Sequence, residues 1–297
     1  MNTLRGIFAP ISTPFLRDEE VNYAGLIQNI KHYDQSGLDG YLVLGSTGEN
    51  KSLLSTEKLK VLETILQNKS AGKIVMSGCI FDSVYESVKM AYEMGKLGAD
   101  YLMILPPAYF KDEMTDDVLY KFYMDIADRS EVPCILYNAP QFAGGVTLSQ
   151  QLVRRCADHP NIVGIKDSSS GNIESLLFTV DGKLSVLSGN IDDLFSNLTM
   201  GGSGGILILA NVFPKAVAEL YRMLCKADYE KALPLYEAAL RANKIISSEG
   251  ISAYKALMNC FGLCGGFPRR PLLPITEERK QILLRKIEKY LQILGIN

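Results

Sequence analysis

Histidine and tryptophan are scarce in this sequence. The chain has no tryptophan and only two histidines, His32 and His159. A catalytic zinc normally takes two or three histidines, and a Ser-His-Asp or Cys-His device needs one beside its nucleophile. Each histidine stands in an expected helix or helix-to-strand loop, with no second metal ligand in the surrounding sequence. We therefore expect no bound metal and no histidine-based catalysis.

Paired cysteine motifs are absent as well. Six cysteines are present, and no two of them are spaced as C-x-x-C. Cys260 and Cys264 stand four residues apart, so we expect them to share one face of a helix. A mostly buried set of reduced thiols is the simplest interpretation, and it suits a reducing compartment.

The sequence also lacks a charge excess and long apolar runs. Its 31 basic and 33 acidic residues nearly balance, so the composition gives no electrostatic footprint for nucleic acid. No run of about 18 apolar residues could span a membrane, and the N-terminus does not resemble a signal peptide. We expect a cytoplasmic protein whose partners are a small molecule and further copies of itself, with neither membrane nor nucleic acid involved.

Short apolar runs alternate with amphipathic segments through most of the 297 residues. The expected strands cover residues 6–11, 40–44, 74–77, 100–105, 133–137, 162–165, 184–187 and 205–209. Eight regular strand–helix pairs without a break in composition favour a closed (β/α)8 TIM barrel over an open doubly wound sheet. The barrel should occupy residues 1–226, and residues 227–297 should form a C-terminal helical extension.

Polar residues mark the expected helix starts. Asn22, Ser83 and Thr115 each precede an amphipathic segment and are predicted N-caps. Thr147 and Gln150 have the spacing of a capping box, which predicts a helix start at Thr147.

Residues 161–169 contain the side chain that best indicates chemistry. A short apolar strand, residues 162–165, is followed directly by Lys166 and Asp167. Burial disfavours the ammonium form of a lysine and frees its amine as a nucleophile, as a Schiff-base lysine requires. The structural alternative is a lysine that caps the strand and extends into solvent.

In an α/β barrel the active site lies at the carboxyl ends of the strands. The residues at or just after those predicted ends include Ser46, Thr47, Tyr109, Tyr137, Lys166, Gly189 and Asn190. This convergence favours a lysine-centred site over scattered structural roles. Because no histidine is available, Tyr137 is the candidate proton carrier beside Lys166. A core tyrosine with a satisfied hydroxyl is the alternative.

The loop of residues 45–49, G-S-T-G-E, has the composition of a carboxylate cradle. Its two glycines permit a tight turn, and hydroxyls with exposed N–H groups suit a small anion. An ordinary turn between strand and helix is the alternative. The glycine-rich run 201–205 lacks the G-x-G-x-x-G pattern and leads into a strand, so it does not indicate a nucleotide site.

Taken together, the motifs resemble those of the dihydrodipicolinate synthase / N-acetylneuraminate lyase family of pyruvate-dependent class I aldolases. The similarity runs from about residue 4 to residue 273. It rests on G-S-T-G-E at 45–49, Y-N-x-P at 137–140, G-I-K-D at 164–167 and G-G-x-G-G-I…A-N at 201–211. Each motif is modest alone, and their order and spacing make the resemblance specific.

The resemblance implies roles for the reacting residues. Lys166 would form a Schiff base with pyruvate or another 2-keto acid, and Tyr137 would move protons at the substrate hydroxyl. Tyr109 matches the family tyrosine that is lent across a subunit interface. No cofactor is implied, since the protonated imine is itself the electron sink, and the family is typically a homotetramer built as a dimer of dimers.

The resemblance also implies a binding pocket. Ser46 and Thr47, with Gly48 beside them, would hold the substrate carboxylate, and Ile206 would line the pyruvate pocket.

One position departs from the synthase branch of the family. That branch has an arginine two residues after the proline of Y-N-x-P, where it grips the carboxylate of the aldehyde substrate; here the position is Phe142. An apolar ring cannot make a bidentate ion pair. We therefore expect a lyase that cleaves a sialic-acid-like or 2-keto-3-deoxy sugar acid to pyruvate and an aldehyde. Phe142 and Gly189 would line the site of that substrate. Its hydroxyls would be hydrogen-bonded by Ser168, Asn190, Asp192 and Asp193, with helix capping as the structural alternative for each of these four.

Two alternatives stay open. The first is 4-hydroxy-tetrahydrodipicolinate (dihydrodipicolinate) synthase, which would make a lysine precursor despite Phe142. The second is a non-catalytic paralogue that binds a keto acid. The sequence leaves open the aldehyde and its stereochemistry, the pathway, and the choice between dimer and tetramer.

Overall fold

The computed structural model describes residues 4–296. Its eight strands form a closed parallel barrel in the order β1 to β8, which confirms the predicted (β/α)8 fold. The strands are β1 Gly6–Pro10, β2 Gly40–Val43, β3 Ile74–Cys79, β4 Tyr101–Ile104, β5 Cys134–Asn138, β6 Ile162–Asp167, β7 Ser185–Ser188 and β8 Gly204–Ile206. Strand β8 ends earlier than predicted because Ile208–Asn211 forms a 3₁₀ turn, η5.

Helices alternate with the strands and then continue as the C-terminal extension. The helices are α1 Tyr23–Asp34, α2 Ser55–Asn68, α3 Val84–Leu97, α4 Asp116–Ala127, α5 Gln150–Cys156, α6 Ile173–Val180, α7 Leu194–Thr199, α8 Pro214–Cys225, α9 Tyr229–Ser247, α10 Ile251–Cys260 and α11 Glu277–Leu291. Within residues 4–296 no helix is long and apolar enough to cross a bilayer.

The chain divides into two compact units. Of the described residues, the first comprises 4–6 and 74–206, and the second comprises 7–73 and 207–296. The predicted division between residues 226 and 227 falls inside the second unit and stays a prediction.

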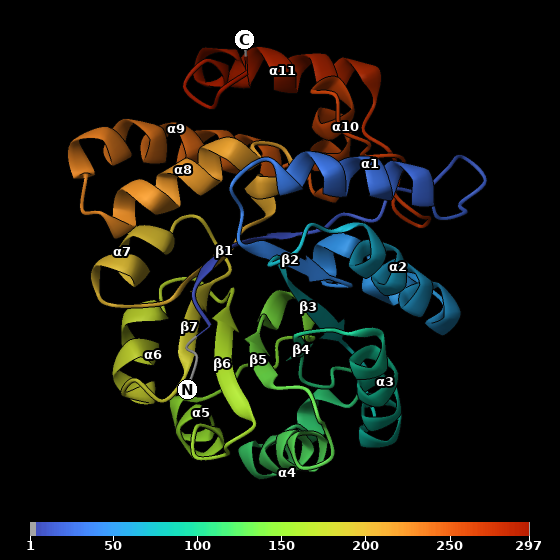
Figure 1. Ribbon diagram of the computed structural model, residues 1–297, viewed down its shortest axis with the longest axis vertical. Coiled ribbons are helices and arrows are strands. Elements are labelled where there is room, and N and C mark those ends of the chain that lie inside the picture. The colour runs from blue at the N-terminus through green and yellow to red at the C-terminus, as the bar shows by residue number, and fades with distance from the viewer. Residues whose placement is uncertain (1–3, 297) are drawn as a thin grey trace. The chain divides into compact units, whose positions relative to one another are not determined.

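The first unit contains strands β3 to β8 with helices α3 to α7, and its helices α3 to α6 lie outside the strands (Figure 1). Parallel pairing of β5 with β6 places Tyr137 opposite Lys166 and Asn138 opposite Asp167. The N-caps predicted for this unit are confirmed at Ser83, which accepts a hydrogen bond from the Glu86 amide, and at Thr115.

The predicted helix start at Thr147 is wrong. Helix α5 begins two residues later, and its N-cap is Ser149, whose hydroxyl accepts a hydrogen bond from the Leu152 amide at 3.1 Å. Ser149 also donates to Asp116, so the neighbouring helix start favours this register.

The second unit contains β1 from Ile7 onward, β2, the helices α1 and α2, and the helices from α8 onward. Helices α8 and α9 pack together, and α9 packs against α11, as Figure 1 shows. The predicted N-cap Asn22 is confirmed, because its side chain accepts a hydrogen bond from the Gly25 amide at 2.9 Å. Phe213 precedes α8, and Pro214 occupies its first position, where a proline is well tolerated.

The prediction that Cys260 and Cys264 share a helix face is wrong. Helix α10 ends at Cys260, and Gly262 with a φ of 81° carries the chain away from the helix. All six cysteines are free, and Cys79, Cys134 and Cys156 are buried. Burial raises the pKa of Cys134 to about 12, which makes this thiol inert. The expectation of mostly buried thiols therefore holds for half of the set.

Candidate active site

Lys166 lies near the carboxyl end of β6 in the first unit. Its side chain is buried, with 5% of the residue exposed, and its Nζ lies 3.4 Å from the Tyr137 hydroxyl. The same nitrogen lies 4.4 Å from the centre of the Tyr137 ring. The alternative in which the lysine extends into solvent is therefore wrong, and the predicted pairing of Lys166 with Tyr137 is confirmed.

The pair combines an amine and a phenol in one buried place. The amine lies at hydrogen-bonding distance from the phenol hydroxyl, which is the spacing that proton exchange between two groups requires. Tyr137 is itself only 2% exposed, so its position relative to Lys166 is fixed by the β5–β6 register as well as by packing. The geometry fits a nucleophile with an adjacent proton carrier.

A buried carboxylate follows the lysine, and the sequence reasoning missed its role. Asp167 is 1% exposed. Its Oδ1 accepts hydrogen bonds from Asn138 Nδ2 at 3.1 Å and the Ser169 amide at 2.8 Å. Its Oδ2 accepts one from Asn172 Nδ2 at 3.1 Å. Because Asn138 follows Tyr137 as Asp167 follows Lys166, this network ties together the two strand ends that carry the reacting pair.

A signal for this network was present in the two motifs. The Y-N motif ends strand β5 and the K-D motif ends the neighbouring parallel strand β6. Asn138, which follows Tyr137, therefore lies opposite Asp167, which follows Lys166. The Asn138 Oδ1 also accepts a hydrogen bond from the Leu148 amide at 3.1 Å. Both oxygens of a buried carboxylate are thus satisfied by neutral donors, as burial of a charge requires.

Gly189 contributes through its backbone. Its amide donates to the Asp167 carbonyl oxygen at 2.5 Å. A Cβ added to Gly189 would lie 1.8 Å from the Ser168 hydroxyl oxygen, so only glycine allows this approach. Ser168 is itself buried, and its amide donates to the Asn138 carbonyl oxygen at 2.8 Å. Whether Ser168 and Gly189 also bind substrate stays a prediction.

Asn190 is already engaged by its neighbours. Its Nδ2 lies 3.0 Å from the Ser170 hydroxyl and 3.5 Å from Asp193 Oδ2. Partial burial raises the pKa of Asp193, against hydrogen bonds from Gly171 and Asn190 that lower it. A substrate hydroxyl would have to join or replace these contacts, so a binding role for Asn190 stays a prediction.

Three further predicted residues lie at different depths in the first unit. Ile206 is fully buried at the end of β8. Phe142 ends the 3₁₀ turn η4, Pro140–Phe142, and is 51% exposed. Tyr109 is 83% exposed and packs edge-to-face against Phe110, with ring centroids 5.0 Å apart. Tyr109 therefore presents its hydroxyl on the surface of this chain.

The predicted carboxylate loop belongs to the second unit. Ser46–Gly48 forms the 3₁₀ turn η1, closed by hydrogen bonds from the Gly48 amide to Gly45 O and from the Glu49 amide to Ser46 O, both 3.0 Å. A Cβ on Gly48 would lie 3.0 Å from the Ile11 carbonyl oxygen, so the tight turn suits glycine. The placement of Ser46, Thr47 and Gly48 beside Lys166 stays a prediction.

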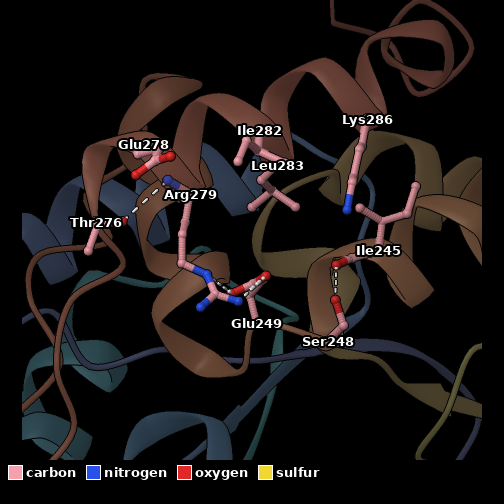
Figure 2. A pocket seen from close by; sticks show the side chains of 9 residues that line it. All are labelled: Ile245, Ser248, Glu249, Thr276, Glu278, Arg279, Ile282, Leu283 and Lys286. Atoms are coloured by element: carbon pink, nitrogen blue, oxygen red, sulfur yellow. Dashed lines mark hydrogen bonds and ion pairs between the residues drawn. The ribbon is translucent and has the colours of Figure 1, made fainter.

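A metal site and a surface hollow are two other features that could indicate function, and neither involves Lys166 or Tyr137. Residues 4–296 contain no group of three or more His, Cys, Asp or Glu side chains arranged to hold a metal ion. His159 lies 3.0 Å from Asp128, in a surface contact. A hollow in the second unit, drawn in Figure 2, is lined by helices α9 and α11 and by the Arg279–Glu249 ion pair. None of the predicted site residues lines it.

Comparison with known proteins gives matches over most of the chain. The profile of the dihydrodipicolinate synthetase family matches residues 3–290. The curated 4-hydroxy-tetrahydrodipicolinate synthase of Methanosphaerula palustris is 33% identical, and the match covers 96% of this chain and 99% of the relative. That of Methanospirillum hungatei is 31% identical over the same shares. The crystal structure of the chloride-inhibited dihydrodipicolinate synthase from Acinetobacter baumannii, complexed with pyruvate, is 29% identical; it has a TM-score of 0.91 and covers 99% of this chain and 100% of that chain.

Proposed function

Because the chain belongs to the dihydrodipicolinate synthetase family of pyruvate-dependent aldolases, we propose that Lys166 is its Schiff-base nucleophile. The observation that carries this proposal is the 3.4 Å contact between the buried Lys166 Nζ and the Tyr137 hydroxyl. The amine would attack C2 of pyruvate, and the carbonyl oxygen would leave as water, giving a protonated imine. Loss of a proton from C3 then gives an enamine, which is the carbon nucleophile toward an aldehyde.

Tyr137 has the position to carry the protons of this reaction. In condensation the enamine carbon attacks the aldehyde carbon and the aldehyde oxygen takes up a proton; cleavage runs the same steps in reverse. Water then hydrolyses the imine and restores the amine of Lys166. The phenol lies at hydrogen-bonding distance from the amine, and this supports a role in which it would exchange protons with both the leaving water and the substrate hydroxyl.

We further propose that the turn of residues 46–48 binds the pyruvate carboxylate and that Ile206 lines the pocket. Ser46 and Thr47 follow β2, and Ile206 ends β8, so all three stand at carboxyl ends of barrel strands, where such sites lie. Tyr109 would enter the site of a neighbouring subunit in a homotetramer, since its hydroxyl is exposed on its own chain. The expected cytoplasmic location stays a prediction.

Borohydride trapping tests the covalent step. With pyruvate present, reduction of the imine should leave a stable secondary amine at Lys166, located by peptide mass. Lys166→Ala should abolish the adduct, whereas Lys183→Ala, which removes an exposed lysine of the same unit paired with Asp158, should not. Absence of an adduct in the wild-type protein would leave the non-catalytic keto-acid-binding alternative in its place.

The second reactant is a finer question, and two observations point in different directions. The curated relatives carry the name 4-hydroxy-tetrahydrodipicolinate synthase, which favours condensation with aspartate semialdehyde over the sugar-acid cleavage expected from sequence. Phe142 favours cleavage of a 2-keto-3-deoxy acid, because an exposed ring cannot grip a carboxylate. We therefore propose the synthase reaction first, with 2-keto-3-deoxy acid cleavage as the second candidate.

A substrate panel separates these two candidates. A coupled assay with pyruvate and aspartate semialdehyde measures condensation, and pyruvate release from N-acetylneuraminate or 2-keto-3-deoxy sugar acids measures cleavage. Turnover at about 1–10³ s⁻¹, the range of ordinary enzymes, identifies the physiological class. Slow turnover of the semialdehyde beside ordinary turnover of a sugar acid would reverse our order.

A further inference from the structure

The second unit buries a carboxylate directly after the predicted carboxylate-binding turn. Glu49 is 6% exposed and directly follows the turn of residues 46–48, in which Ser46 and Thr47 are half-buried and Gly48 is buried. Its backbone is left-handed, with φ 53° and ψ 41°, a conformation that costs a non-glycine residue free energy and must be held by its surroundings. A buried carboxylate also needs a compensating charge or several hydrogen bonds.

The C-terminal extension supplies the compensating charge. Lys255 of α10 is 1% exposed and forms an ion pair with Glu49. Its Nζ also donates to the carbonyl oxygens of Thr13 and Phe267, both at 2.7 Å, and lies 4.7 Å from the centre of the Phe15 ring. Burial lowers the pKa of Lys255 to about 8, and Glu49 acts in the opposite direction.

The same ammonium is also linked to the turn through Thr13. Thr13, whose carbonyl oxygen it binds, donates its hydroxyl to the Gly48 carbonyl oxygen at 2.8 Å. Lys255 therefore connects, through Thr13 and through Glu49, to the last residue of the turn and to the residue after it. These contacts all lie within the second unit.

Arg269 fixes the remaining oxygen of Glu49. Its amide donates to Glu49 Oε2 at 2.9 Å, and its guanidinium makes two 2.7 Å contacts with Glu57. The segment before it runs close to α10, since a Cβ on Gly265 would lie 2.0 Å from the Lys255 carbonyl oxygen. Both carboxylate oxygens of Glu49 are thus held by residues from the extension.

We propose that Lys255 and Glu49 are positioning residues that hold the turn of residues 46–48 in its substrate-binding shape, an inference that rests on the proposed function of that turn. Buried ion pairs often contribute little net stability, but removal of one partner leaves the other charge buried and uncompensated. The ion pair would affect the affinity for pyruvate. It holds Glu49 in its left-handed conformation, and Glu49 directly follows the turn whose backbone carries the Ser46 and Thr47 side chains. The C-terminal extension would in this way complete the site without touching substrate.

The test compares Lys255→Met and Glu49→Gln with the wild-type protein. We measure the pyruvate concentration that gives half-maximal borohydride trapping, the KM for pyruvate, kcat at saturating pyruvate and the thermal midpoint. Lys255→Met should raise half-saturation by about tenfold or more, while saturating pyruvate still labels Lys166 completely. Glu49→Gln keeps the shape of the side chain and one acceptor oxygen. It should raise the pyruvate concentration for half-maximal trapping by about threefold or more.

Lys231→Met is the matched control. It makes the same substitution in the extension at an exposed lysine paired with Asp228, and should leave half-saturation unchanged. No adduct in the wild-type protein would overturn the proposed function together with this inference. This inference alone would be overturned if the wild-type protein forms the adduct and the folded variants need a pyruvate concentration for half-maximal trapping within about twofold of the wild-type value. If Lys255→Met does not fold, Glu49→Gln decides.

Discussion

Replacing Tyr137 with phenylalanine removes one oxygen and leaves the aromatic ring over Lys166. The lost hydroxyl lies 3.4 Å from Lys166 Nζ, and the ring centre lies 4.4 Å away. We expect turnover to fall by about 10²–10⁴-fold, the usual contribution of a positioned proton carrier. Steady-state rates at saturating pyruvate, with circular dichroism to verify folding, measure this effect.

Tyr123→Phe is the control for that substitution. The Tyr123 hydroxyl is buried in the same unit and has no hydrogen-bond partner in the described chain, so its removal should leave turnover unchanged. If Tyr137→Phe keeps more than about a tenth of the wild-type turnover, Tyr137 is not the proton carrier.

Phe142→Arg tests whether the side chain at position 142 determines which aldehyde the protein accepts. The position is 51% exposed at the end of a 3₁₀ turn, so a longer charged side chain can be accommodated there without loss of buried packing. If the carboxylate of aspartate semialdehyde lacks a partner in this protein, a bidentate arginine should raise kcat/KM for it by about tenfold or more.

Arg154→Lys, a conservative change in helix α5, is a control that should leave kcat/KM unaltered. An unchanged kcat/KM for Phe142→Arg would mean that another group already binds the aldehyde carboxylate, or that the semialdehyde is not a substrate. The substrate panel distinguishes these two outcomes.

Sequence reasoning at the scale of residues succeeded where two motifs end neighbouring strands. Lys166 and Tyr137 could be predicted as partners because both close strands that a barrel places side by side. The ion pair of Lys255 with Glu49 could not, because neither residue carries a motif that specifies the other and their partnership depends on how the extension packs. In the sequence, Lys255 is one of several charged residues in the helical C-terminal segment, and nothing in its neighbours predicts that it is buried.

At the scale of elements, periodicity predicted every strand but not every boundary. The predicted strand 162–165 continues to Asp167 because Lys166 and Asp167 pair with Leu187 and Ser188 of β7. The apolar run alone predicts an end at Ile165. The shift of the α5 start from Thr147 to Ser149 has a similar origin, since Ser149 also contacts Asp116 of α4, which local spacing does not reveal.

Ser149→Ala tests which residue caps α5. Loss of the hydroxyl leaves the Leu152 amide without its 3.1 Å acceptor, so the free energy of unfolding should fall by about 1 kcal/mol. Thr147→Ala, two residues away and exposed, should change it by less than about 0.5 kcal/mol. Urea unfolding monitored by circular dichroism gives both values; equal losses would argue against Ser149 as the cap.

At the scale of the whole molecule, eight repeated units were enough to predict a closed barrel. Assembly is harder to infer, because one chain shows only the surface that a partner would cover. Tyr109 and Phe110 are 83% and 68% exposed and pack against each other. Adjacent exposed aromatic rings are typical of interface residues, which supports the proposal that Tyr109 enters a neighbouring site.

Complementation between two inactive variants tests whether Tyr109 acts in a neighbouring subunit. Tyr109→Phe keeps Lys166 but lacks the hydroxyl, and Lys166→Ala keeps Tyr109 but lacks the nucleophile. Refolding them together should restore turnover, because a mixed assembly contains sites that combine Lys166 of one subunit with Tyr109 of the other. Lys166→Ala mixed with Tyr137→Phe is the control: Tyr137 lies 3.4 Å from Lys166 in the same chain, so no mixed site is complete. Recovery in neither mixture, or a monomer in sedimentation velocity, would place Tyr109 outside the reaction.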